Sequence, residues 1–194
     1  LENGIACNIA GGSDHAFWNR GEAFYLLNDQ AIAAQYLIKK KKCHKILIVD
    51  LDVHQGNGTA EIFQNNADVI TFSMHGQSNY PFRKETSDYD IALPDKTDDT
   101  TYLSILQETL PELLNIHRPD FVFYLAGVDI LGTDKLGKLG CTLEGCKTRD
   151  SYVLGLCKSL GIPVQVSMGG GYSPAIKTII EAHANTYRVA RALY

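Results

Sequence analysis

Short apolar runs alternate with longer segments of helical periodicity along the whole chain. The runs that predict strands are residues 4–10, 45–50, 69–73, 121–126 and 164–168, and the segments that predict helices lie near 28–40, 58–64, 99–117, 142–160 and 174–193. Strands that alternate with helices pair in parallel, because each helix returns the chain to the end where the next strand begins. The pattern therefore predicts an α/β fold built on a mainly parallel sheet.

The helical segment at residues 99–117 carries apolar residues at three- and four-residue spacing from Tyr102 to Leu114. That spacing gives a helix one apolar face. Pro111 lies within the segment, and a proline lacks the N–H that the helix needs and collides with the preceding turn. We expect the helix to bend or break there.

Composition and charge limit the classes of protein that the chain can belong to. The 194 residues are 45% hydrophobic and 21% charged, which suffices for one buried core, so we expect a single domain over residues 1–194. The net charge of -4 argues against a general nucleic-acid binder. No apolar stretch approaches the roughly 20 residues of a membrane-spanning helix. Five cysteines without close paired spacing indicate reduced thiols, and we expect a cytoplasmic protein.

Polar or glycine-rich residues follow each predicted strand. They are Gly11-Gly12-Ser13-Asp14-His15, Asp50-Leu51-Asp52-Val53-His54, Ser73 with His75, Gly127-Val128-Asp129 and Gly169-Gly170-Gly171-Tyr172. The carboxyl ends of parallel strands meet at one edge of the sheet, and ligands bind in the crevice outside that edge. Surface loops placed at random would scatter this chemistry, so we expect one site to contain all five groups.

Three of these residues suit a catalytic metal ion. Asp52, His54 and Asp129 could supply two oxygens and one nitrogen and leave a coordination position open. An open position is typical of catalytic sites, whereas structural zinc sites are closed by four protein ligands that usually include thiolates. Zinc is the first choice, and Fe²⁺ or Co²⁺ would accept the same donors.

Two further side chains suit proton transfer and oxyanion stabilisation. His15 is placed to act as a general base toward water, with Asn57 orienting its ring. Tyr172 follows three glycines that allow close approach of the backbone, so its hydroxyl could donate to a developing oxyanion. Taken singly, such a histidine more often has a structural role and such a tyrosine more often packs in a core. Their shared position at the carboxyl edge of the predicted sheet favours the catalytic interpretation.

Six motifs together resemble, in order, those of the zinc-dependent histone deacetylase family, especially its bacterial members. They are residues 11–17, Asn28-Asp29, residues 50–59, Gly127-Val128-Asp129, Asp134-Lys135-Leu136-Gly137 and Gly169-Gly170-Gly171-Tyr172. The resemblance implies a three-layer α/β/α fold of the arginase-deacetylase type. It covers essentially all 194 residues, but the family's catalytic domain has further residues before the position of Leu1. We therefore expect an N-terminally truncated member with an exposed sheet edge, through which it could self-associate.

The resemblance implies zinc-dependent hydrolysis of an N-acetylated amine, with acetyl-lysine or an acetylpolyamine as the substrate. The family's metal ligands match Asp52, His54 and Asp129. Its general base and acid matches His15, and the tyrosine that polarises the acyl oxygen matches Tyr172. Its potassium site matches Asp50, Ser73 and the main chain of Asp52, His54 and Met74. The residues that match its acyl-lysine channel are Phe24, Tyr80, Leu136 and Gly170, although lone aromatic residues such as Phe24 and Tyr80 more often belong to a core.

Asp14 departs from the family pattern. Family members usually have two consecutive histidines where this chain has Asp14-His15, and the first of them donates to the carboxylate that Asp50 matches. Two ionised acids cannot repeat that contact, and neighbouring like charges raise one pKa. Loss of one such stabilising group commonly costs about 100- to 1,000-fold in rate.

Two alternative functions follow from these observations. Asp14 and the missing N-terminal part favour an impaired deacetylase-like domain that keeps its metal and binds acylated ligands or a protein partner. Hydrolysis of another C–N bond, as in the arginase relatives, would need a two-metal cluster with more acidic ligands. Only one metal site is evident in the sequence.

Overall fold

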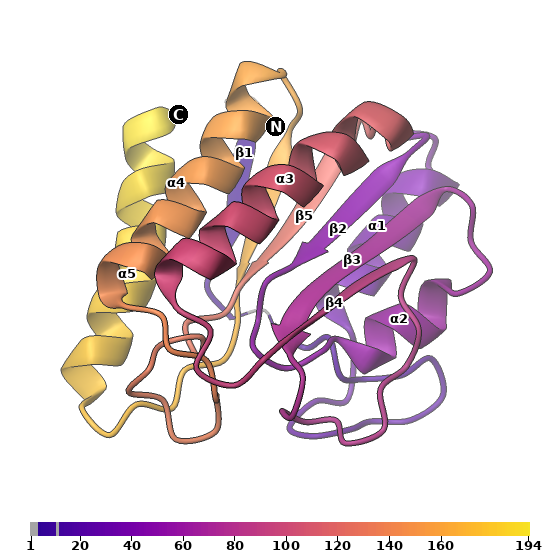
Figure 1. Cartoon of the computed structure of the whole chain (residues 1–194). Helices are drawn as coiled ribbons and strands as arrows, with labels where there is room; N and C mark the ends of the chain where they lie inside the picture. The colour runs from indigo at the N-terminus through magenta and orange to yellow at the C-terminus, as the bar shows by residue number, and fades with distance from the viewer. Residues whose placement is uncertain (1–3, 11) are drawn as a thin grey trace.

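The computed structural model of the protein describes residues 4–10 and 12–194, so Gly11 of the first glycine motif lies outside the described residues. Within these residues, a sheet of six strands, all parallel, forms the centre of the molecule (Figure 1). In spatial order the strands are β1 (Ile5–Asn8), β6 (Val164–Met168), β5 (Phe121–Ala126), β2 (Ile46–Asp50), β3 (Val69–Gly76) and β4 (Tyr89–Leu93). The predicted α/β fold is confirmed.

In the described part of the chain, five helices cover the two faces of the sheet (Figure 1). They are α1 (Asp29–Lys39) and α2 (Asn57–Phe63) on one face, and α3 (Asp99–His117), α4 (Leu143–Ser159) and α5 (Ile176–Leu193) on the other. Three of the helices begin at polar caps, because the side chains of Asn28, Asp98 and Thr142 each accept a hydrogen bond from the N–H three residues on. Among the described residues, no helix is long and apolar enough to cross a membrane.

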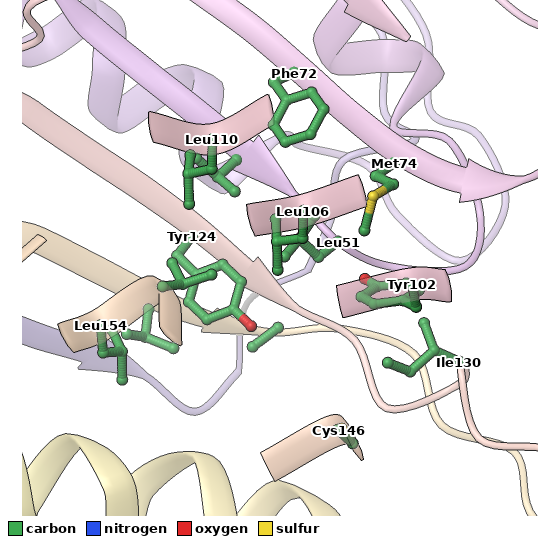
Figure 2. Packing of buried hydrophobic residues seen from close by; sticks show 14 of the residues in the cluster. Leu51, Phe72, Met74, Tyr102, Leu106, Leu110, Tyr124, Ile130, Cys146 and Leu154 are labelled. Atoms are coloured by element: carbon green, nitrogen blue, oxygen red, sulfur yellow. The ribbon is translucent and has the colours of Figure 1, made fainter. Parts of the chain in front are cut away.

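The central strand β2 shows why the predicted strands are continuous apolar runs. Leu47 and Val49 pack into the core shared with α3, α4 and α5, whereas Ile46 and Ile48 pack into the core shared with α1 and α2. A strand buried on both faces has no solvent side and therefore no polar alternation. Figure 2 shows the larger core, in which residues of α3 such as Leu106 gather with Phe72 of β3 and Leu51 after β2.

The sequence interpretation missed β4. This strand lies at the edge of the sheet and pairs only with β3, so its residues alternate between partly buried and exposed positions over Tyr89–Leu93. An edge strand of this kind lacks the continuous apolar run by which the other strands were predicted.

Of the two outcomes expected at Pro111, the break is wrong, because α3 runs from Asp99 to His117 with the proline inside it, and the bend stays a prediction. Pro111 has no N–H to donate to the carbonyl of Gln107, four residues earlier. The Tyr152 hydroxyl of α4 donates to that carbonyl instead, over 3.3 Å. Packing against the neighbouring helix thus replaces the bond that proline removes.

The five cysteines predict a simple labelling pattern. All are free; Cys7 is exposed and the other four are buried. Burial raises the pKa of Cys141, Cys146 and Cys157 to about 12, and a thiol reacts as its thiolate. A thiol reagent at mildly alkaline pH should modify one cysteine of the native chain and all five in denaturant, and Cys7→Ser should remove the fast reaction. Rapid modification of a second native thiol would contradict the buried placement.

Candidate active site

The candidate site lies outside the carboxyl ends of β2 and β5. These strands are neighbours in the sheet, but the chain continues from β2 toward β3 and from β5 toward β6, in opposite directions. Such a divergence leaves a crevice between the two following loops. A cavity of about 270 Å³ occupies this place. The predicted site residues that line it are Asp14, His15, Phe24, Asp52, His54, Tyr80, Leu136, Gly170 and Tyr172.

The chain turns sharply after β2 rather than continuing as an extended strand. The Asp50 carboxylate accepts the N–H of Asp52 at 3.1 Å, and the Asp52 carboxylate accepts the N–H of His54 at 2.9 Å. Both bonds join a side chain to the backbone two residues on, which is how aspartate stabilises a turn. The alternating Asp-x-Asp-x-His pattern therefore folds its own loop and places Asp52 and His54 at the cavity.

Asp52, His54 and Asp129 converge in space, as the sequence predicts. They form the only group of three or more His, Cys, Asp and Glu residues with metal-ligand spacing in the described part of the chain, with one ligand atom of each within 4.8 Å of the others. The Nδ1 atom of His54 lies 3.1 Å from Oδ1 of Asp52 and 3.1 Å from Oδ2 of Asp129. All three residues are buried.

The charges of this group call for a cation between its donors. Burial alone would lower the pKa of His54, but hydrogen bonds and charge from Asp129 and Asp52 raise it to about 11. Burial and the charge of Asp52 raise the pKa of Asp129 to about 7. A proton on His54 Nδ1 would lie between the two carboxylates, where a metal ion would also lie, so metal binding would release it. The donor set fits a divalent ion.

Backbone N–H groups hold the two carboxylates in place. Val53 donates to Asp129 Oδ1 at 3.0 Å, and Gly170, from the loop after β6, donates to Asp52 Oδ2 at 2.6 Å. A Cβ atom on Gly170 would lie 2.0 Å from Asp129 Oδ2, so this position needs glycine. Gly170 lines the cavity as expected, and its N–H also holds the Asp52 side chain of the Asp-His-Asp group.

A buried arginine supports the loops that follow β2 and β5, which carry Asp52, His54 and Asp129. Arg149 of α4 donates to the carbonyl oxygens of Leu51 at 3.2 Å and Gly127 at 2.6 Å. Its charge pairs with Asp150 at 2.7 Å, and both side chains are fully buried. The Asp150 carboxylate also accepts hydrogen bonds from the hydroxyls of Tyr124 and Thr186. This network ties the loops after β2 and β5 to α4 and α5.

His15 and Tyr172 flank the cavity. The Nδ1 atom of His15 lies 2.8 Å from Oδ1 of Asn57, as expected for an orienting partner. The Tyr172 ring meets the His54 ring edge-on at 6.3 Å. Burial, followed by the charges of Asp52 and Asp129, raises the pKa of Tyr172, so its hydroxyl keeps its proton and can donate it in a hydrogen bond.

Asp14 and Asp50 lie on the same side of the site. A Cβ atom on Gly56 would come within 2.6 Å of Asp50 Oδ2 and 3.0 Å of Asp14 Oδ2, so both carboxylates converge on that glycine. Within the described part of the chain, Asp14 Oδ2 has no hydrogen-bond partner. Burial and the charge of Asp52 raise the pKa of Asp14, and burial and the charge of Asp14 raise that of Asp50. The pair therefore favours keeping a proton.

The remaining predicted residues divide between the cavity entrance and the sheet. Phe24 is 76% exposed and Leu136 is 49% exposed, so both lie at the rim. Asp50 and Ser73 are paired neighbours in β2 and β3, and Met74 is buried beside them. The Ser73 hydroxyl lies 2.9 Å from Nδ1 of His75.

The structure places three residues at the site that sequence reasoning did not assign to it. Glu22 bonds to Asn57, Tyr25 lines the cavity, and Asp134 accepts the N–H groups of Leu136 and Tyr172. Asp134 lies within one of the quoted motifs, which was a signal for it. Glu22 and Tyr25 lie in a loop with no metal-ligand or catalytic spacing, so no comparable signal pointed to them.

The chain is an α/β protein with a parallel sheet, and the buried Asp-His-Asp group at the carboxyl edge of that sheet could hold a metal ion. The chain belongs to the histone deacetylase domain family, because the model described as "Histone deacetylase domain" matches residues 1–187. It is 48% identical over 194 residues to an uncharacterized protein of Picosynechococcus sp., and the alignment covers 100% of this chain and 65% of that protein. It is 32% identical over 177 residues to the acetoin utilization protein AcuC of Staphylococcus aureus, and that alignment covers 85% of this chain and 45% of the relative.

A solved structure shares the fold. The acetylpolyamine aminohydrolase from Burkholderia pseudomallei superposes with a TM-score of 0.80 at 26% identity, over 98% of this chain and 57% of that one. The chain thus spans about half to two thirds of the length of the proteins that it matches.

Proposed function

We propose that residues 1–194 form one deacetylase-like domain and that the protein is a metal-dependent hydrolase that removes an acetyl group from an acetylated amine. One observation carries the proposal: Asp52, His54 and Asp129 converge at a cavity that His15 and Tyr172 also line or flank. Membership of the histone deacetylase domain family supports the same reaction.

The chemistry of the donors favours Zn²⁺ as the ion that Asp52, His54 and Asp129 hold, and Fe²⁺ or Co²⁺ could replace it. When bound, such an ion polarises the acyl carbonyl and lowers the pKa of water. We place a potassium ion at Asp50, Ser73 and the main chain of Asp52, His54 and Met74, which the resemblance implies.

The residues of this chain have separate roles in the proposed reaction. His15 accepts a proton from the attacking water and returns one to the leaving amine. The Tyr172 hydroxyl donates to the acyl oxygen as negative charge develops there. Phe24, Tyr80 and Leu136 form the wall of the channel that admits the acylated amine. Asn57 orients His15, and Asp50 and Asp14 lie beside the loop that carries Asp52 and His54.

The proposed substrates are an acetylated lysine side chain or an acetylated small amine. The cavity of about 270 Å³, with Phe24 and Leu136 at its rim, suits the methylene chain of either amine. The five free cysteines support a reducing, cytoplasmic location. Self-association through the outer edge of β1, which pairs only with β6, stays a prediction.

The metal site gives the first test. The complete protein should hold one divalent ion after dialysis, and Asp129→Ala should lose it, because one of three ligands is removed. Glu144→Ala, at an acid whose side chain is 78% exposed, is the control and should keep the ion. Elemental analysis combined with turnover assays on acetyl-lysine peptides and acetylpolyamines provides the measurement. An ion retained by Asp129→Ala would contradict the ligand set, and a bound ion without turnover on any acyl substrate would favour the binding-domain alternative.

A further inference from the structure

Glu22 stands at the edge of the candidate site in a tight turn. The backbone N–H and carbonyl of Glu22 bond to those of Tyr25, over 3.0 and 3.1 Å. Between them Ala23 takes a φ of 53°, in the left-handed region that turns of this kind require. The turn fixes the direction in which the Glu22 side chain leaves the backbone, and that side chain is 25% exposed.

One carboxylate oxygen of Glu22 joins two residues of the site. Oε1 accepts a hydrogen bond from Nδ2 of Asn57 at 2.7 Å and another from the hydroxyl of Tyr80 at 2.7 Å. Partial burial alone would raise the pKa of Glu22, but these two bonds and the charge of Arg20 lower it overall. Glu22 is therefore a carboxylate at neutral pH and can only accept hydrogen bonds.

This restriction fixes the orientation of the Asn57 amide. Because Glu22 can only accept, the NH₂ group of Asn57 must face Glu22, and its Oδ1 atom must then face His15. The Oδ1 atom can only accept, so the hydrogen bond of 2.8 Å requires the hydrogen on Nδ1 of His15. In neutral His15 the lone pair then lies on Nε2 and is free to accept a proton.

The reverse amide orientation would give the opposite result. With its NH₂ group toward His15, Asn57 would donate to Nδ1 and leave the hydrogen of the neutral ring on Nε2. That tautomer cannot accept a proton at Nε2. A base held in the wrong tautomer can cost up to about 10⁴-fold in rate, as the serine proteases show.

The same oxygen also positions the neighbouring aromatic wall. The Tyr80 ring meets the His15 ring edge-on, with ring centres 5.2 Å apart. Its hydroxyl is held by Glu22, so one carboxylate fixes both the amide behind the histidine and the tyrosine beside it.

We propose that Glu22 is a positioning residue that sets the tautomer of His15 through Asn57. The inference rests on the proposed role of His15 as the base, but the tautomer itself can be measured without turnover. Glu22 does not touch the reacting atoms. Its effect passes through the orientation of one amide group.

A set of variants at Glu22 tests the proposal in the complete protein. Glu22→Leu removes the acceptor and should lower kcat about 10- to 100-fold, a part of the roughly 100- to 10,000-fold that a general base contributes, with a smaller change in KM. Glu22→Gln keeps an oxygen that can accept from Asn57 and should restore part of the loss. Arg20→Gln is the matched control, because it removes a third partner of Glu22, at 3.6 Å, and leaves the bonds from Asn57 and Tyr80 in place.

A compensating change separates positioning from general damage. Asn57→Asp supplies an acceptor for His15 Nδ1 that needs no partner to orient it. In the Glu22→Leu background this second change should raise kcat, whereas in the parent it should lower kcat, since it would set two carboxylates against each other. A merely structural role for Glu22 would not reverse the sign.

Nitrogen NMR of the imidazole rings provides the direct readout. The parent should show His15 with its proton on Nδ1, assigned by the loss of its signals in His15→Ala, and Glu22→Leu should shift population to the Nε2 tautomer. Unchanged His15 signals together with a kcat within twofold of the parent would overturn the inference. Absence of turnover in every variant, with the expected change in the NMR signals, would instead count against the proposed function alone.

Discussion

Replacing Arg149 with methionine should lower the free energy of unfolding by about 3–5 kcal/mol, which is the usual loss when one partner of a buried ion pair is removed. The change leaves Asp150 as an uncompensated buried charge and strips a donor from the carbonyls of Leu51 and Gly127. Urea denaturation of the parent and the variant measures the difference. Metal affinity should fall as well, because these carbonyls belong to the loops that carry the ligands.

A second arginine supplies the control for this prediction. Arg188 pairs with Glu181 on the surface, where the two side chains are 59% and 48% exposed. Arg188→Met should cost less than about 1 kcal/mol, since exposed pairs contribute little. If Arg149→Met abolishes folding, Arg149→Lys keeps the charge and provides a milder variant. Equal losses at positions 149 and 188 would refute a special role for the buried network.

Replacing Asp14 with histidine should raise deacetylation turnover by at least about tenfold, a conservative share of the 100- to 1,000-fold typical of such a group. A histidine could donate to Asp50 and would replace a carboxylate oxygen that now lacks a partner. The backbone should tolerate the change, because the Asp14 carbonyl is held by the N–H of Thr59 at 3.0 Å. Steady-state kinetics at matched metal occupancy provide the measurement.

Two companion variants show which property of Asp14 limits the reaction. Asp14→Asn removes the acidic group without adding a positive charge, so a gain from asparagine alone would identify repulsion between the acids as the cause. His15→Ala should abolish turnover in either background, since His15 is the proposed base. An Asp14→His protein no faster than its parent would refute the view that this substitution limits catalysis.

Most of the fold could be predicted because burial leaves its mark on the local sequence. Five of the six strands and all five helices lie where the apolar patterns place them. The edge strand β4 was missed, because two of its five residues are exposed and break the apolar run. The continuity of α3 at Pro111 could not be predicted, since the hydroxyl that donates to the carbonyl of Gln107 comes from Tyr152 on another helix.

The site could be predicted only as far as its residues stand next to strands. Asp52, His54 and Asp129 follow β2 and β5, and the order of the strands brings them together. Glu22 and Arg149 carry no such mark. Glu22 meets Asn57 across 35 positions of the chain, and Arg149 meets Leu51 across 98, so only the folded structure reveals these contacts.

The divergence of the chain after β2 and β5 gives the proposed metal ion a mechanical role. One side of the sheet, with β3 and β4, follows Asp52 and His54, and the other side, with β6, follows Asp129. An ion held by all three residues would connect these two parts of the sheet. The N–H of Gly170, in the loop after β6, donates to Asp52 and forms a second connection between the two parts. Loss of the ion would therefore increase the mobility of the loops around the cavity first and leave the sheet intact.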